Sequence, residues 1–330
     1  MKYVKKKLIG GIEYYYFNYN IKVRDKINNF SYYLGRILPD NLKESMESFF
    51  NKISLSVSKE ISSTQNYFFK ENIKHIEFSR FNYLLLNHSL FEKELREFRT
   101  LFYVLFVLNS NRSEGSKVTQ KDVEKIMNKR LKPKSMIGRE IINSINAINY
   151  SFSSDMKWSA KSIKRIHELL FFDIFPGIAG NYKKVNNVIN NSKTTDWTKV
   201  SEDMKNLLIW LKKNKKKLYP PELVLEFHWR FEKIHPFEDG NGRVGRIILN
   251  ALLIELGYAP VIFFSENHSS YCNAINKAIL GRKKALAKHY VESVKKSSLA
   301  IEKYSKEGKI KGGSSRVGRW EIQKNKIRVW

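Results

Sequence analysis

The sequence has 330 residues, of which 42% are hydrophobic and 13% aromatic, and this supply of apolar area excludes a disordered chain and a small disulfide-stapled protein. The single cysteine, Cys272, excludes an internal disulfide and a cysteine-rich zinc site. The longest apolar run, residues 101–108, is too short to span a membrane, and the first residues lack a secretion signal, so we expect a cytoplasmic protein.

The formal net charge of +28 would attract anionic partners such as nucleic acid. Lysine is abundant along the whole chain, however, and no helix-turn-helix, RNP or zinc-finger pattern accompanies it. We therefore favour a general compositional bias over a dedicated nucleic-acid surface.

Residues 1–36 are predicted to form a small antiparallel β meander. Three β-favouring runs, 4–9, 12–23 and 28–35, are separated by the Gly10-Gly11 pair and by a polar turn at 24–26. From there to residue 118 the apolar residues recur every three or four positions, which predicts a helical N-terminal region. A polar stretch at 110–116 interrupts it.

Residues 119–300 are predicted to form a helical core, so the chain belongs to the mainly α class. Thr119 offers an N-cap with Asp122 at the third helical position, and Pro220-Pro221 mark another helix start. A helix over 159–175 should end at Pro176-Gly177, and residues 185–192 alternate as in a short hairpin. The lysine run 212–217 is typical of a solvated helix end, and residues 301–330 are expected to form a loose basic tail or a small hairpin.

The stretch HPFEDGNGRVGR, residues 235–246, contains the glycine spacing of a dinucleotide-binding turn. That turn needs a buried strand before it and an acidic residue about twenty positions after it, and neither is present. The flanking segments have helical spacing, so the stretch is predicted to be a loop between two helices.

Such a loop is suited to bind phosphate. The start of the second helix carries partial positive charge, and Arg243 and Arg246 on its first turns add two guanidinium groups. Asp239 is a hard oxygen ligand for Mg²⁺, and His235 is placed to act as a general base.

The same stretch resembles the signature of the Fic family at every defined position. AGNYK, residues 179–183, resembles a second family segment, although Lys183 stands where arginine is usual, and the resemblance spans about residues 160–286. It implies an all-helical core with a flap hairpin, which transfers AMP from ATP to a hydroxyl of a target protein with Mg²⁺ as cofactor.

The resemblance also implies roles for individual residues. His235 would deprotonate the target hydroxyl, and Asp239 would hold Mg²⁺. The anion cradle would be Gly240, Asn241 and Gly242, with Asn241 on the α-phosphate, while Arg243 and Arg246 would hold the β and γ phosphates. Glycine at 242 together with the acid at 239 is typical of nucleotidyl transfer. The flap that docks the target would comprise Val185, Asn186, Asn187, Val188 and Ile189.

SNRSEG, residues 110–115, resembles the inhibitory motif of the same family. Ser110 and Glu114 are four apart, so on a helix they would face the same way, and Glu114 would pair with Arg246 and block productive ATP binding. Ser113 stands where isoleucine is frequent. The alternative is a helix end closed by Gly115 with a solvated Glu114. The resemblance also allows Glu114 to assist removal of AMP.

Tyr271 resembles one of two aromatic residues that line the nucleotide pocket, with Cys272 in place of the second, and either contacts adenine or belongs to the core. His228 has no further metal ligands at a suitable spacing, so we interpret it as a packing residue.

Two functions compete at this stage: an autoinhibited adenylyltransferase, and a basic nucleic-acid-binding protein on a Fic-like scaffold. Transfer of UMP, self-modification and a homodimer remain open, and the target protein is not readable from the sequence. We expect no membrane partner.

Overall fold

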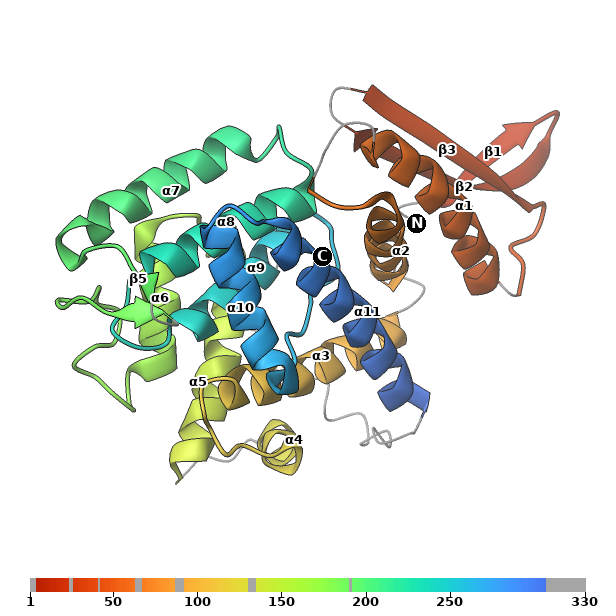
Figure 1. The fold of residues 1–330 in the computed structure, drawn as a ribbon. Coiled ribbons are helices and arrows are strands. Elements are labelled where there is room, and N and C mark those ends of the chain that lie inside the picture. Colours follow the sequence, from red (N-terminus) through yellow and green to blue (C-terminus); the bar gives the residue numbers. More distant parts are fainter. Residues whose placement is uncertain are drawn as a thin grey trace. The chain divides into compact units, whose positions relative to one another are not determined.

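The computed structural model describes residues 4–23, 26–40, 42–62, 67–86, 92–129, 135–189 and 192–306. Contacts divide the chain into two compact units, Met1–Arg96 with Gly257–Ala259, and Glu97–Leu256 with Pro260–Trp330 (Figure 1). Among the described helices, none is long and apolar enough to cross a membrane.

The first unit begins with the predicted antiparallel meander, in the order β1 (Val4–Ile9), β2 (Ile12–Val23) and β3 (Lys26–Gly35). Gly10 and Gly11 have φ of 58° and 79°, which is the left-handed geometry of a two-residue hairpin turn, and they join the paired residues Ile9 and Ile12. Residues 24–25 of the predicted polar turn lie outside the described residues, and Lys26 already belongs to β3.

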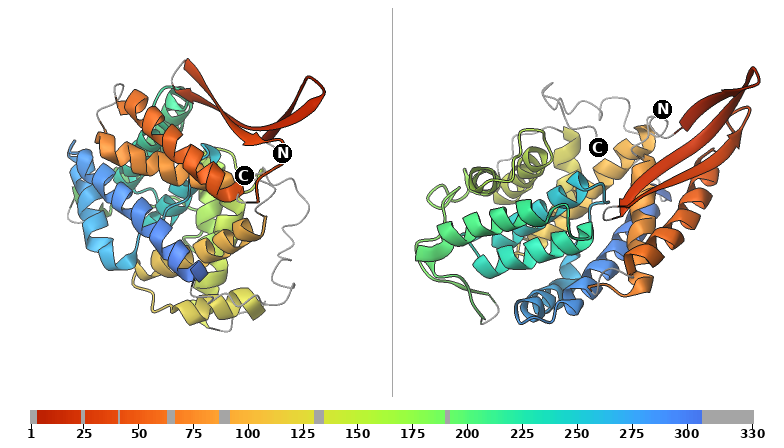
Figure 2. Two further views of the ribbon diagram at one scale, coloured as in Figure 1. Left: turned by 90° about the vertical axis from the view of Figure 1, so that its right-hand side faces the viewer. Right: turned by 90° about the horizontal axis from the view of Figure 1, so that it is seen from above.

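Two helices, α1 (Leu42–Ser62) and α2 (Lys70–Leu86), complete this unit. Phe17 of β2 makes an edge contact with Phe50 of α1 at 5.2 Å between ring centroids, and Phe50 stacks on Phe81 of α2 at 5.0 Å. Figure 2 shows α1 along one face of the twisted sheet, so this aromatic cluster is the core between sheet and helices.

Over its described residues the second unit is helical apart from one short hairpin, as the sequence predicts. It contains α3 (Glu92–Arg112) from Glu97 onward, α4 (Gln120–Lys129), α5 (Met136–Ser151), α6 (Ala160–Phe171), β4 (Val188–Ile189), β5 (Ser192–Lys193), η2 (Trp197–Lys199), α7 (Val200–Asn214), α8 (Pro220–Ile234), α9 (Asn241–Glu255), η3 (Ser265–Asn267), α10 (His268–Ile279) and α11 (Lys284–Lys306). Most residues of α8 and α9 are buried, so the loop between them starts and ends on the core.

Local signals place several helix ends correctly. Thr119 caps α4 through its hydroxyl, which accepts from the N–H of Asp122 at 3.2 Å, while the Asp122 carboxylate accepts from the N–H of Thr119 at 2.9 Å. Pro220 occupies the first turn of α8. The lysine run lies at the end of α7, where it is mainly exposed and Lys215 pairs with Glu255 at 2.5 Å.

Two predicted boundaries were wrong. Helix α6 ends at Phe171 and not near Pro176, because the Asn143 side chain of α5 donates to the Leu170 carbonyl at 3.1 Å and to Asp173 at 2.7 Å. Helix α11 continues to Lys306, so it passes the predicted start of the tail, and the rest of the tail lies outside the described residues. Helix α3 runs through the start of the polar stretch to Arg112.

Candidate active site

The loop between α8 and α9 begins at His235, which ends α8 in the left-handed region with φ 50° and ψ 61°. Among the described residues it is the one non-glycine residue with positive φ, a conformation that costs free energy and concentrates at functional sites. Its Nδ1 lies 3.3 Å from the carbonyl oxygen of Glu232. Because Nδ1 carries the proton of that hydrogen bond, Nε2 keeps its lone pair.

Burial lowers the pKa of His235 to about 4, so the ring is neutral near neutral pH. The side chain remains 17% exposed. A neutral imidazole with a free, partly accessible Nε2 can accept a proton from a bound hydroxyl group.

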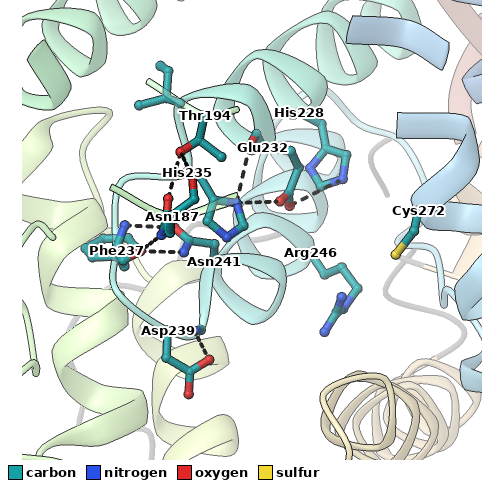
Figure 3. Close-up of polar contacts among 12 residues, drawn as sticks. Asn187, Thr194, His228, Glu232, His235, Phe237, Asp239, Asn241, Arg246 and Cys272 are labelled. Atoms are coloured by element: carbon teal, nitrogen blue, oxygen red, sulfur yellow. Dashed lines mark hydrogen bonds and ion pairs between the residues drawn. The ribbon is translucent and has the colours of Figure 1, made fainter. Parts of the chain in front are cut away.

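Asn241 determines the shape of the loop. Its amide oxygen accepts from the N–H of Phe237 at 2.8 Å, and its amide nitrogen donates to the carbonyl of Phe237 at 2.8 Å (Figure 3). The resemblance implies a contact of Asn241 with the α-phosphate, whereas in this structure both ends of its side chain hold the loop closed.

A residue that the sequence analysis did not single out fixes the far side of this loop. His167 of α6 accepts from the N–H of Gly180 at 2.9 Å through Nδ1, so Nε2 carries the proton and donates to the carbonyl of Asp239 at 3.0 Å. The ring also stacks on Phe237 at 3.9 Å. These partners are 13 and 72 positions away in the sequence, which is why no local pattern indicates them.

Gly240 precedes the first turn of α9 with φ 77°, and a Cβ there would lie 2.3 Å from the ring of Phe171. Both facts require glycine. The first N–H groups of a helix have no intrahelical carbonyl partner, so this end of α9 offers donors and partial positive charge to an anion.

The two predicted arginines differ in their surroundings. The Arg243 guanidinium lies 3.3 Å from Asp239 and 4.6 Å from the ring centroid of Phe171. Arg246 is 1% exposed. Its Nε donates to the Ser110 hydroxyl at 3.1 Å, and its Nη2 donates to the Ser110 carbonyl at 2.9 Å and to Glu114 at 2.7 Å. The structure thus brings Ser110, Glu114 and Arg246 together.

Glu114 was predicted to lie on a helix. In the structure it lies in the turn after α3. Gly115 has φ 86°, which ends the helix. Burial opposes ionisation of Glu114, but the adjacent Arg246 outweighs it and holds the pKa of the carboxyl below its usual value. A Cβ on Gly242 would lie 2.4 Å from Glu114 Oε1, so the carboxylate occupies the space beside the loop glycine.

The hairpin β4–β5 is tied to the same loop. Lys183 is 3% exposed, and its Nζ donates to Asn187 at 2.7 Å and to Thr194 at 2.7 Å. Asn187 in turn donates to the carbonyl of Phe237 at 3.0 Å. Of the predicted flap residues, Val185 and Val188 are exposed, Asn186 donates to Asp196 at 3.0 Å, and Ile189 is half-buried. Lysine at 183 therefore anchors the hairpin.

Tyr271 lies in the core. It is 5% exposed, its hydroxyl lies 2.7 Å from His228 Nε2, and its ring contacts Phe263 at 5.1 Å. Tyr271 therefore has the surroundings of a core residue, and His228 has those of a buried packing residue. Glu232 lies beside both and was not predicted as a site residue; a charged residue among the apolar residues of α8 was the available signal.

The loop has one carboxylate suited to Mg²⁺. Among the described residues, no group of three or more His, Cys, Asp or Glu side chains could hold a metal. Mg²⁺ is commonly bound by one or two carboxylates together with substrate phosphates and water. The Asp239 side chain is 53% exposed and lies beside the anion-binding end of α9, so it fits such a shared site.

Residues 157–253 match the Fic/DOC family model. A protein adenylyltransferase Fic of Nematostella vectensis is 27% identical over 184 residues, which are 53% of this chain and 43% of that protein. A probable protein adenylyltransferase of Aquifex aeolicus is 44% identical over 75 residues, which are 23% of this chain and 22% of that protein. The chain thus spans less than half the length of these curated relatives.

Two solved structures show the same fold. A Fic-domain-containing signaling protein from Bacteroides thetaiotaomicron superposes with a TM-score of 0.61 at 21% identity, over 70% of this chain and 97% of that chain. Fic-1 from C. elegans superposes with a TM-score of 0.55 at 18% identity, over 83% and 94%. The chain is thus similar to the Fic/DOC family over residues 157–253, and it shares its fold with these two structures.

Proposed function

We propose that the chain is a protein adenylyltransferase that transfers AMP from ATP to a hydroxyl group of a target protein. The observation that carries this proposal is the neutral His235, whose free Nε2 lies in the loop that leads into the anion-binding end of α9. The names of the relatives support the same activity.

In this reaction His235 Nε2 takes the proton of the target hydroxyl, and the hydroxyl oxygen attacks the α-phosphorus of ATP. The bond from that phosphorus to the bridging oxygen of the β-phosphate breaks, and pyrophosphate leaves with the electron pair. Since the Asn241 side chain is engaged within the loop, main-chain N–H groups near Gly240 and Gly242 are the donors for phosphate oxygens. Arg243 and Arg246 hold the β and γ phosphates.

Asp239 would hold Mg²⁺ together with phosphate oxygens of ATP. When bound, the ion offsets the charge of the phosphates and of the leaving pyrophosphate. Arg243, which lies 3.3 Å from the Asp239 carboxylate, would add a positive charge beside the ion.

Glu114 acts as an inhibitor in this proposal. Its carboxylate occupies the Arg246 guanidinium and the space beside Gly242, where phosphate would bind. The exposed residues of the hairpin dock the target, whose identity is open and which includes the protein itself. Removal of the carboxylate should therefore free Arg246 and raise transfer.

The test is label transfer from ATP labelled at the α-phosphate. Glu114→Gly should incorporate more label than the wild type into itself and into lysate proteins, and the double variant Glu114→Gly/His235→Ala should incorporate none. Equal incorporation by wild type and Glu114→Gly would refute the inhibition. Equal incorporation with and without His235 would refute its role as the base.

A further inference from the structure

A buried carboxyl group, Glu232, lies behind two groups that the proposed reaction uses. Its side chain is 3% exposed, with Oε1 3.9 Å from His228 Nε2 and Oε2 4.0 Å from His235 Nδ1 (Figure 3). Arg246, on the neighbouring helix α9, is equally buried. The proposed reaction assigns no role to Glu232, although burying a carboxyl group costs free energy.

The burial of Glu232 favours a protonated carboxyl group. Among the described residues its Oε1 is buried without a hydrogen-bond partner, a position in which an ionised oxygen is costly. The Tyr271 hydroxyl lies 2.7 Å from His228 Nε2, on the same side of α8. Arg246 and Tyr271 favour the ionised form of Glu232, but burial outweighs them and raises the pKa of the carboxyl group to about 8.

Gly245 shows how closely the carboxyl group fits. A Cβ on Gly245 would lie 2.2 Å from Glu232 Oε1, so α9 approaches the carboxyl group directly at the residue before Arg246. A charged carboxylate in this position would attract the Arg246 guanidinium and compete with any phosphate for it. A neutral acid fills the same space without that competition.

We propose that Glu232 is a positioning residue, held as a neutral carboxylic acid, that supports His235 from behind and leaves the charge of Arg246 to an incoming anion. This inference rests on the proposed function. The groups that face Glu232 are His228 within α8, His235 at its end, Arg246 on α9, Tyr271 on α10 and Glu114 after α3. Ionisation of Glu232 therefore weakens ATP binding.

The first test measures the affinity for ATP by calorimetry at about pH 6.5 and about pH 9.5, in the Glu114→Gly background, where Arg246 is free. We expect affinity to fall about tenfold or more at the higher pH, the change that one pKa unit of coupling represents. With Glu232→Gln added, which has the shape of the neutral acid, the fall should be much smaller.

Glu226→Gln is the matched control. Glu226 is a second buried glutamate of α8, at 4% exposure, but it is paired with Arg230 at 2.9 Å and with Lys283 at 2.8 Å. The Glu226→Gln substitution should therefore leave the pH dependence of ATP binding unchanged. Glu232→Ala should lower ATP affinity at both pH values, because the carboxyl group no longer supports the neighbouring side chains. An equal pH-dependent fall with Glu232→Gln, or loss of ATP binding by Glu232→Gln at the lower pH, would overturn the proposal.

A second measurement separates this proposal from the proposed function. A folded-state pKa raised above the unfolded value means that the folded protein holds an extra proton, whose stabilisation is present at low pH and lost as the pH rises through about 8. The urea midpoint should fall more steeply with pH in wild type and Glu226→Gln than in Glu232→Gln. If ATP binds at no pH, the proposed function is refuted, but the slopes of the urea midpoint against pH still test the protonation state of Glu232. Equal slopes in the three proteins would refute the neutral carboxylic acid.

Discussion

Replacing Gly242 by alanine should release the inhibition by Glu114. The added Cβ would lie 2.4 Å from Glu114 Oε1 and 3.0 Å from Arg246 Nη1, and both distances are shorter than ordinary van der Waals contact. Arg246 is 1% exposed and is held by two hydrogen bonds that it donates to Ser110, whereas the Glu114 carboxylate is the flexible end of a side chain that is 24% exposed. Glu114 is therefore the group that moves.

The size of the effect follows from the contact that is lost. The 2.7 Å hydrogen bond between Arg246 and Glu114 joins two charged groups, and such bonds contribute about 1.5–3 kcal/mol. Complete loss of that contact corresponds to about a 10- to 100-fold increase in transfer. The variant should still fold, since alanine favours a helix more than glycine and Gly242 lies in α9 with ordinary backbone angles.

The assay is the initial rate of label transfer from ATP, measured for wild type, Gly242→Ala, Glu114→Gly and the double variant. The alanine substitution also hinders phosphate binding directly. Its effect on the transfer rate in the Glu114→Gly background measures that hindrance alone. The ratio of the transfer rate of the Gly242→Ala variant to that of its parent should be larger when Glu114 is present. The same ratio in both backgrounds would refute the claim that Glu114 and position 242 compete for space.

Four further outcomes are expected. With Glu114→Gly, transfer should stay constant as the pH falls to about 5 and decrease through about 4, because His235 loses its free Nε2 on protonation; a decrease centred near pH 6.5 would contradict the lowered pKa. Gly240→Ala should lower the free energy of unfolding by at least about 2 kcal/mol in urea titrations, because φ is 77° and the Phe171 ring occupies the Cβ position. Lys183→Met should reduce transfer to target proteins while calorimetry shows unchanged ATP affinity, since the two short hydrogen bonds that are lost, both 2.7 Å, anchor the hairpin. Chelation of divalent ions should stop transfer, and Asp239→Ala should raise the Mg²⁺ concentration needed for half-maximal rate; a rate independent of Mg²⁺ would exclude that role.

The sequence predicted those parts of the fold that depend on near neighbours. The meander follows from Gly10-Gly11 between alternating strands, and the start of α4 follows from Thr119 and Asp122 three positions later. The end of α6 could not be predicted in this way, because the side chain that bonds the Leu170 carbonyl is Asn143 on a different helix.

The candidate site shows the same limit. The residues of the loop could be selected because they lie together in one motif, and Glu114 could be added through the family resemblance. The pairing of Glu114 with Arg246 across 132 positions was expected from that resemblance, whereas the contact of Tyr271 with His228 across 43 positions was not. Glu232 was overlooked because its importance depends on its burial between those residues, and a glutamate on a helix is ordinarily solvated.

The central claim is that AMP, and not phosphate, is transferred. Glu114→Gly protein should be incubated in parallel with ATP labelled at the α-phosphate and ATP labelled at the γ-phosphate. Our account predicts that the α label becomes covalently bound to protein while the γ label is released as pyrophosphate, and that His235→Ala prevents both. Incorporation of the γ label, or release of pyrophosphate without any protein-bound α label, would contradict it.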